Sequence, residues 1–199
     1  LFHRVANTLN YMDIKTVIVS CGTCMDQLQK YRFEQIFPGC RLLDIHEYLL
    51  EKQVTLKQQS DQQYLYHDPC HSPMKTYQPS QVLQSLLGKE VPLSDRCCGE
   101  AGTLAVTRPD ISTQVRFRKQ EELHIGIESL TGRRQTTNGE VKLLTSCPAC
   151  QQGLARYEAD TGLTTSYIIM ELVKDRLGEN WQANFIDNIN NGGVEQVLL

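Results

Sequence analysis

The chain has 199 residues and a formal net charge of -3. This charge gives no support for binding to nucleic acid or to an anionic membrane through a strongly basic surface. Hydrophobic residues make up 40% of the sequence, typical of a globular protein with one sizeable domain or two small ones. We find no apolar run of the ~20 residues that a transmembrane helix needs, and the chain does not open with the pattern of a secretory signal.

Cysteine is the unusual residue in this composition. The eight cysteines lie in tight groups between regular segments. A secreted disulfide framework is usually much shorter and richer in loops. The grouping therefore indicates a reducing compartment, in which thiolates are kept for metal or redox chemistry.

The first part of the chain predicts one strand and two helices. Residues 16–20 form a β-branched run, which predicts a buried strand. Cys21 and Cys24 follow directly and lead into a predicted helix over 25–33. Apolar residues that share one helical face predict a second helix over 43–52.

The middle of the chain continues the alternation of strand and helix. The run 63–67 predicts a strand, and 80–87 predicts a helix that Gly88 ends. Residues 90–93 predict a short strand. A long helix with a polar face is then expected over 110–129.

The last part begins with a polar, turn-rich stretch over 131–140, which predicts a mobile loop. Residues 141–145 form a further predicted strand. Two helices are expected after it, over 151–159 and 165–176.

The alternating elements predict an α/β fold with a mostly parallel sheet flanked by helices. Each of the four cysteine groups follows a predicted strand. In a parallel sheet this position is the carboxyl edge, beside the N-termini of helices, where ligands bind. We therefore expect the thiols to converge on one side of the molecule.

An internal repeat is visible around two Ser-Cys-x-x-Cys turns. Residues 17–24 and 142–150 each contain an apolar strand that runs into such a turn. In both copies the next helix carries a leucine and a tyrosine, and a further amphipathic helix follows. The pattern indicates a duplicated unit.

The second copy of this unit has an upstream portion that the first copy lacks. Only 20 residues precede Cys21, too few to hold the equivalent cysteines. We interpret the first copy as truncated. The predicted domains are the remnant of the first unit, the complete second unit and a loosely packed tail, over 1–55, 56–180 and 181–199.

The thiols of the second unit favour a cluster over a single ion. Soft thiolates select iron–sulfur clusters, zinc or Cu(I). The adjacent Cys97 and Cys98 cannot comfortably bind one tetrahedral ion, but they can ligate different atoms of a multinuclear cluster. With Cys70, Cys147 and Cys150 the unit offers five thiolates, more than one structural zinc requires.

Three ordered motifs in the second unit resemble the cysteine-rich (CCG) domain family: His67–His71, Arg96–Thr103 and Ser146–Cys150. That family includes the B subunit of heterodisulfide reductase, the iron–sulfur subunits of glycolate oxidase and anaerobic glycerol-3-phosphate dehydrogenase, and a lactate-utilisation protein. The resemblance extends over roughly 17–175. Family members usually carry two such units, in agreement with the repeat.

The resemblance implies a ligand set for a [4Fe–4S]-type cluster: Cys70, Cys97, Cys98, Cys147 and Cys150. It also implies that Cys21 and Cys24 are metal ligands at the surviving end of the first unit's site. Zinc in place of the cluster, or a site without metal in this piece, stays open as an alternative.

The resemblance further implies an electron-transfer part of a larger oxidoreductase, rather than a catalytic unit by itself. FAD in a partner domain would oxidise a small 2-hydroxy acid such as glycolate or lactate. Flavin-binding and ferredoxin-like domains of the same parent protein or complex would be the partners, with a quinone or carrier as electron acceptor. The expected location is the cytoplasm, peripheral to the inner face of the membrane. The alternatives are a thiol/disulfide reductase module and a zinc-binding structural or interaction domain.

Three further residues lie near these motifs or between them: Cys40, His67 and His71. Cys40 lies outside the motifs and is expected to be a packed thiol. His67 and His71 flank Cys70 closely enough to ligate a metal or to shuttle protons. The equally weighted alternative is that they cap a turn or donate a hydrogen bond to a sulfur.

Overall fold

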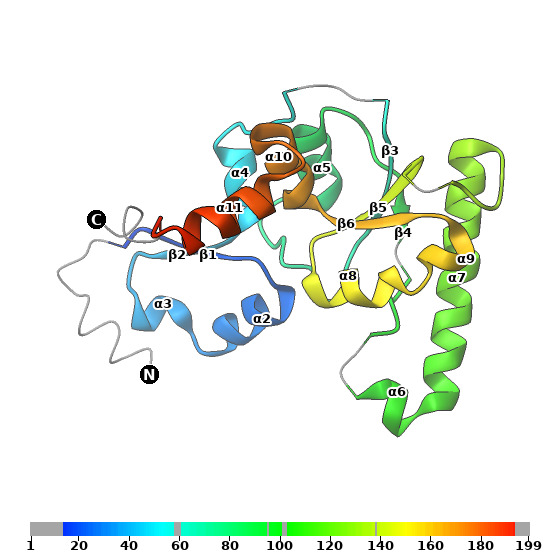
Figure 1. The fold of residues 1–199 in the computed structure, drawn as a ribbon. Coiled ribbons are helices and arrows are strands. Elements are labelled where there is room, and N and C mark those ends of the chain that lie inside the picture. Colours follow the sequence, from blue (N-terminus) through cyan, green and yellow to red (C-terminus); the bar gives the residue numbers. More distant parts are fainter. Residues whose placement is uncertain (1–13, 58–60, 95, 101–102, 138, 194–199) are drawn as a thin grey trace.

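The computed structural model describes residues 14–57, 61–94, 96–100, 103–137 and 139–193 (Figure 1). Its strands are β1 (Thr16–Val19), β2 (Arg41–Asp44), β3 (Gln63–His67), β4 (Leu93–Ser94), β5 (Val141–Thr145) and β6 (Thr164–Tyr167). Its longer helices are α2 (Gly22–Lys30), α4 (Ile45–Glu51), α5 (Pro79–Leu87), α7 (Pro109–Thr131), α8 (Pro148–Ala155), α10 (Ile168–Leu177) and α11 (Trp181–Asn190). Short helices are α3 (Phe33–Ile36), α6 (Leu104–Thr107) and α9 (Glu158–Thr161).

The strands confirm the predicted parallel α/β architecture. The larger sheet has the order β4-β3-β5-β6, and every pair in it is parallel. Strands β1 and β2 form a separate parallel pair, which lies to the left of the larger sheet in Figure 1. Parallel neighbours need crossover connections, and helices provide them here.

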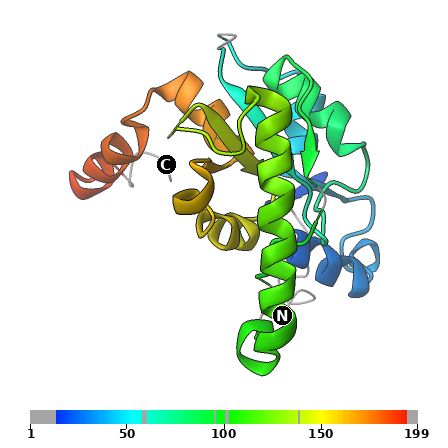
Figure 2. The ribbon, with the colours of Figure 1, turned by 90° about the vertical axis from the view of Figure 1, so that its right-hand side faces the viewer.

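Helices cover both faces of the larger sheet. Because side chains alternate along a strand, Leu65 and Leu143 point to one face, where they pack with residues of α7 and α8. Tyr66 and Leu144 point to the other face and pack with α5 and α10. Figure 2 shows α7 as one long helix that runs past the sheet. No helix in the described part of the chain is both long and apolar enough to cross a bilayer.

Strand β1 forms where it was expected, but the prediction that it is buried is wrong. Its residues are half-buried or exposed, and Ile18 keeps 40% of its surface exposed. Strand β1 has only β2 as a neighbour among the described residues. A strand with one neighbour in a two-stranded sheet is less covered than a strand inside a larger sheet, so its side chains stay more exposed.

The predicted helix over 43–52 is wrong in its first part. Residues 41–44 form strand β2, and the helix begins only at Ile45. Asp44 marks the change, because its carboxylate accepts a hydrogen bond from the backbone N–H of His46 at 2.9 Å and so caps α4.

The predicted helices over 151–159 and 165–176 also differ from the observed elements. Helix α8 ends at Ala155, and α9 is a separate short turn. Residues 164–167 form β6, so the last long helix starts at Ile168. The two threonines and the tyrosine of β6 favour a strand, and pairing with β5 satisfies its backbone.

The internal repeat appears in the order of the elements. The series β1, α2, α3, β2 and α4 has the same order as β5, α8, α9, β6 and α10. Each series begins with a strand that leads into a Cys-x-x-Cys helix and places a second parallel strand beside the first. The two series meet where the hydroxyl of Tyr167 donates to the backbone oxygen of Ser20 at 2.7 Å.

Two glycines allow a matched test of a close approach in this fold. Gly162 and Gly132 both end helices with positive φ, 77° and 72°. A Cβ on Gly162 would lie 1.7 Å from the backbone oxygen of Thr136, whereas one on Gly132 would meet no described atom within 4 Å. We expect Gly132→Ala to lower the free energy of unfolding by about 1–2 kcal/mol, the cost of the left-handed backbone. Gly162→Ala adds the collision and should cost about 1–3 kcal/mol more in chemical denaturation. Equal losses in the two variants would contradict the observed packing.

Candidate metal centre

The register of the larger sheet brings three cysteine motifs to one edge. His67, the last residue of β3, pairs with Ser94 at the end of β4 and with Thr145 at the end of β5. Because these strands are parallel and end at the same rung, the loops that follow them emerge side by side. The carboxyl edge of a parallel sheet is where ligands commonly bind.

These loops surround a cavity of about 280 Å³, close to the lower end of the ~300–1,000 Å³ typical of small-molecule sites. All five cysteines of the predicted second-unit ligand set line it. The lining residues are Thr23, Pro69, Cys70, His71, Cys97, Cys98, Glu100, Cys147, Ala149 and Cys150. The structure therefore brings the predicted thiols together around one space.

The start of α8 supplies two of these thiols. Cys147 is the N-cap residue and Cys150 lies in the first turn, so both are near the positive end of the helix dipole. Both are buried. Hydrogen bonding from the side chain of Cys150, and then from the backbone N–H groups of Cys150 and Ala149, outweighs the effect of burial and lowers the pKa of Cys147 to about 6. Cys147 is thus prepared to act as a thiolate.

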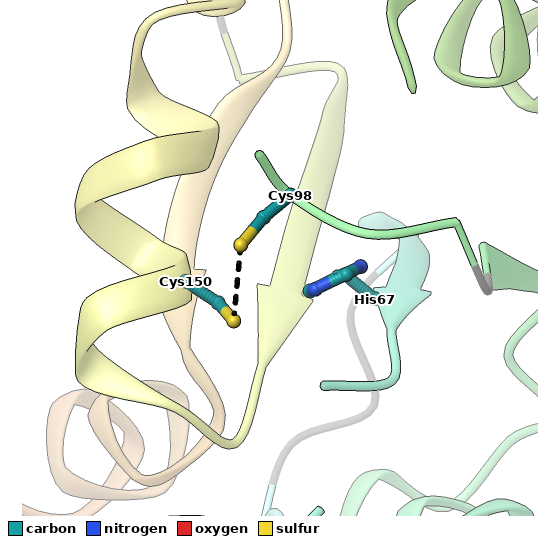
Figure 3. A group of neighbouring side chains, drawn as sticks. All are labelled: His67, Cys98 and Cys150. Carbon is teal, nitrogen blue, oxygen red and sulfur yellow. Dashed lines mark hydrogen bonds between the residues drawn. The ribbon is translucent and has the colours of Figure 1, made fainter. Parts of the chain in front are cut away.

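Cys98 approaches Cys150 from the loop after β4. Their Sγ atoms are 3.3 Å apart and hydrogen-bonded, and both side chains are buried (Figure 3). Hydrogen bonding to Cys150, and then to Cys97, lowers the pKa of Cys98, whereas hydrogen bonding to Cys147, and then to Cys98, raises the pKa of Cys150. The hydroxyl of Tyr157 donates to the backbone oxygen of Cys98 at 3.3 Å and helps to hold the loop.

The loop with the cysteine pair is anchored to α7 by a buried ammonium group. The side chain of Lys119 is fully buried, and its Nζ donates to Ser94 Oγ at 2.5 Å and to Glu122 Oε2 at 2.9 Å. The backbone N–H of Arg96 also donates to the carboxylate of Glu122, at 3.3 Å. This network fixes the end of β4 and hence the start of the loop that carries Cys97.

Cys97 and Cys70 lie toward the rim of the cavity. Cys97 is half-buried and Cys70 is exposed. The backbone N–H of Gly99 donates to Cys97 Sγ at 3.4 Å. Hydrogen bonding to Cys98, followed by burial, raises the pKa of Cys97. The adjacent cysteines therefore differ in position, with Cys98 directed inward and Cys97 nearer the surface.

His67 places a possible nitrogen ligand beside this sulfur pair. It is fully buried, and one of its ring nitrogens lies with Cys98 Sγ and Cys150 Sγ in a group whose atoms are all within 4.8 Å of one another. Figure 3 shows its ring pointing from β3 toward the two sulfurs. His71 behaves differently, because it is exposed and its Nδ1 pairs with Asp26 Oδ2 at 2.5 Å.

The remaining cysteines do not join this cavity. Helix α2 contributes Thr23 to the lining, and neither Cys21 nor Cys24 is part of it. Hydrogen bonding to Cys21 raises the pKa of Cys24, so these two thiols lie next to each other at the start of α2. Cys40 is buried just before β2, with its Sγ donating to the backbone oxygen of Arg41 at 3.7 Å.

Glu100 is a lining residue that the sequence did not single out. It forms an ion pair with Arg156 and closes over Gly153 of α8, where an added Cβ would lie 2.6 Å from the Cβ of Glu100. Its position directly after Cys97-Cys98-Gly99 was the available signal. A glutamate after a cysteine motif is also common at the protein surface. The motif alone therefore did not reveal that Glu100 lines the cavity.

The donor set suits a thiolate-ligated metal group. Five sulfurs from the segments that follow β3, β4 and β5 surround a single space. Soft thiolates bind iron–sulfur clusters and zinc in preference to hard cations. The fold and the site thus define a cysteine-rich α/β domain with a thiol-lined cavity at the carboxyl edge of its sheet.

Comparison with known families agrees with this description. Residues 64–155 match the family called Cysteine-rich domain (CCG). Residues 155–199 match a domain of unknown function, DUF3400. No solved structure matches the chain.

Several curated relatives are similar to parts of the chain. An uncharacterized iron–sulfur protein of Methanococcus maripaludis is 25% identical over 82% of this chain and 32% of its own length. The B subunit of fumarate reductase (CoM/CoB) of Methanothermobacter marburgensis is 25% identical over 68% of this chain and 27% of its own length. The glycolate oxidase iron–sulfur subunit of Escherichia coli is 34% identical over 42% of this chain and 22% of its own length. The chain spans less than a third of the length of each of these relatives.

The contact between the two repeat copies yields a test. Gly22, the first residue of α2, lies against the loop after Cys70, so an added Cβ would be 1.6 Å from the backbone oxygen of His71. Alanine normally favours a helix over glycine by ~1 kcal/mol. We nevertheless expect Gly22→Ala to lower the free energy of unfolding by about 1–3 kcal/mol, because α2 and the loop must separate.

Chemical denaturation measures this loss, with Gln29→Ala on the exposed side of α2 as the control. The control should change stability little. A Gly22→Ala variant that is more stable than the parent chain would mean that α2 does not lie against the Cys70 loop.

Proposed function

We propose that this chain is an iron–sulfur electron-transfer module of a larger oxidoreductase. The observation that carries the proposal is the convergence of Cys70, Cys97, Cys98, Cys147 and Cys150 on one cavity. The proposed group is a [4Fe–4S]-type cluster, and these five thiolates are its candidate ligands. When bound, the cluster supplies a one-electron carrier.

The protein's own residues have distinct tasks in this proposal. Cys98, Cys147 and Cys150 are buried and offer sulfurs to the inner side of the group, where water is excluded. Cys97 and Cys70 lie nearer the surface and would hold its outer side. A cluster bound between an inner and an outer set of thiolates would have one side close to solvent, where a redox partner can approach.

We further propose that the parent protein or complex is a flavin-linked oxidoreductase that acts on a small 2-hydroxy acid of the glycolate or lactate type. The support is the similarity to the glycolate oxidase iron–sulfur subunit. Flavin-binding and ferredoxin-like domains would supply electrons, and a quinone or carrier would accept them. Cys21 and Cys24 would belong to a second site, in the first copy of the repeat.

Anaerobic reconstitution with iron and sulfide tests the cluster. The reduced chain should gain a broad visible absorption, acid-labile sulfide and an EPR signal. Cys98→Ala should lose most of the bound iron, because it removes an inner thiolate. Cys40→Ala is the matched control, since Cys40 is also buried but lies outside the cavity, and it should keep a full spectrum. A colourless, EPR-silent parent chain after reconstitution would refute the cluster.

A structural zinc site is the second candidate, and one observation favours it. Cys98, Cys150 and His67 lie within 4.8 Å of one another, and Cys147 is hydrogen-bonded to Cys150. Three cysteines and a histidine are a common set for a closed tetrahedral zinc site. Metal analysis of protein purified without oxygen separates the candidates. One zinc per chain, with no sulfide and no iron uptake, would favour zinc.

A further inference from the structure

His67 is a buried histidine whose polar atoms lack partners. Its exposed fraction is 0%, and neither ring nitrogen makes a hydrogen bond of normal geometry with any described residue. The other described histidines each have one. His46 Nδ1 is 2.7 Å from Asp44, His71 Nδ1 is 2.5 Å from Asp26, and His124 Nδ1 is 2.5 Å from the backbone oxygen of Arg134.

This arrangement is costly for the protein alone. A neutral imidazole has one N–H donor and one acceptor nitrogen. Leaving a buried polar group unsatisfied costs about 1–3 kcal/mol, so such groups in folded proteins call for an explanation. No described backbone group at this edge of the sheet forms a hydrogen bond with the ring nitrogens of His67, which burial also removes from water. A group bound in the cavity would supply one.

The ring of His67 is aimed at the place where that group would lie. One of its nitrogens is within 4.8 Å of both Cys98 Sγ and Cys150 Sγ, which are themselves 3.3 Å apart. The three side chains come from β3, the loop after β4 and the first turn of α8, and they point toward one another (Figure 3). The imidazole therefore faces the inner side of the thiol-lined cavity.

We propose that His67 donates an N–H hydrogen bond to a sulfur of the bound cluster, either the thiolate of Cys98 or an inorganic sulfide. The inference rests on the proposed function. His67 is then a positioning residue that sets the reduction potential of the cluster and holds Cys98 in place. Nothing in the sequence motif distinguishes this role from that of the exposed His71.

Donation to sulfur fits the ligand count better than coordination of iron. A four-iron cluster needs four protein ligands, and the cavity already offers five thiolates. The sulfurs carry the negative charge of the site, and hydrogen bonds to them are a known determinant of its potential. An N–H donor stabilises the reduced form more, because that form is more negative. Removing the donor should therefore lower the potential.

The experiment compares His67→Leu, which removes the donor, with His67→Gln, which keeps an N–H group at similar reach. His124→Leu, on α7 and outside the cavity, is the control histidine variant. Each chain is reconstituted anaerobically, assayed for iron and sulfide, and titrated by EPR. We expect His67→Leu to keep the cluster but to shift its reduction equilibrium about tenfold toward the oxidised form, about 59 mV for one electron. His67→Gln and the control should stay near the parent value.

Pulsed EPR on the parent chain labelled with ¹⁵N-histidine gives a readout that does not depend on the variants folding. A weak nitrogen coupling that is lost in His67→Gln supports the hydrogen bond. Absence of any nitrogen coupling, or an unchanged potential in a loaded His67→Leu, overturns it. A strong coupling typical of direct coordination also overturns it, in favour of ligation. A parent chain that takes up no cluster refutes the proposed function and this inference together, whereas the other results refute the inference alone.

Discussion

The common rung at which β3, β4 and β5 end is the constraint on which the site depends. His67, Ser94 and Thr145 lie side by side in register, so the next residues of each chain segment leave the sheet at the same edge. A shift of one strand by a single residue would turn its side chains to the opposite face. The hydrophobic packing of Leu65 and Leu143 against α7 and α8 prevents that shift. The core therefore sets the relative positions of the sulfurs.

The same thiols belong to the core and to the site. Cys98, Cys147 and Cys150 are part of one buried cluster with residues of α7 and α8. A buried cysteine packs like a small apolar residue, so these side chains can be ordered without a metal. Their hydrogen bonds to one another keep the sulfurs close, at 3.3 Å for Cys98 and Cys150. Because the three sulfurs are already close together, these side chains need to move little when a metal group binds.

The repeat gives the molecule two Cys-x-x-Cys helices in equivalent positions with different surroundings. In the second copy, Cys147 and Cys150 face a cavity that other loops complete. In the first copy, Cys21 and Cys24 stand beside each other without joining that cavity. The two copies are nevertheless in contact, through Tyr167 with Ser20 and through the close approach of Gly22 to the Cys70 loop. Equivalent local structure thus does not by itself produce equivalent sites.

Local sequence was sufficient to predict the elements with strong patterns and to select the five cysteines that line the cavity. The apolar runs at 63–67 and 141–145 fixed two central strands, and the position of three cysteine groups after β3, β4 and β5 was enough to place their thiols at one edge. The same expectation was wrong for Cys21 and Cys24, because β1 pairs with β2 in a separate sheet. Strands β2 and β6 were missed, because both are short and merge directly into helices. Asp44 and pairing with β5 decide where strand ends and helix begins, and a helical periodicity does not reveal either.

Only the tertiary structure decided which of these residues face the same space. The sequence left His67 and His71 with the same alternatives, since both neighbour Cys70. Folding buries His67 beside Cys98 and Cys150, because it is the last residue of β3, and leaves His71 exposed with Asp26 in the loop that follows. Motif spacing determines the kind of chemistry that this protein can carry. Burial and distance between segments far apart in the chain determine where it takes place, and those depend on packing that no single motif contains.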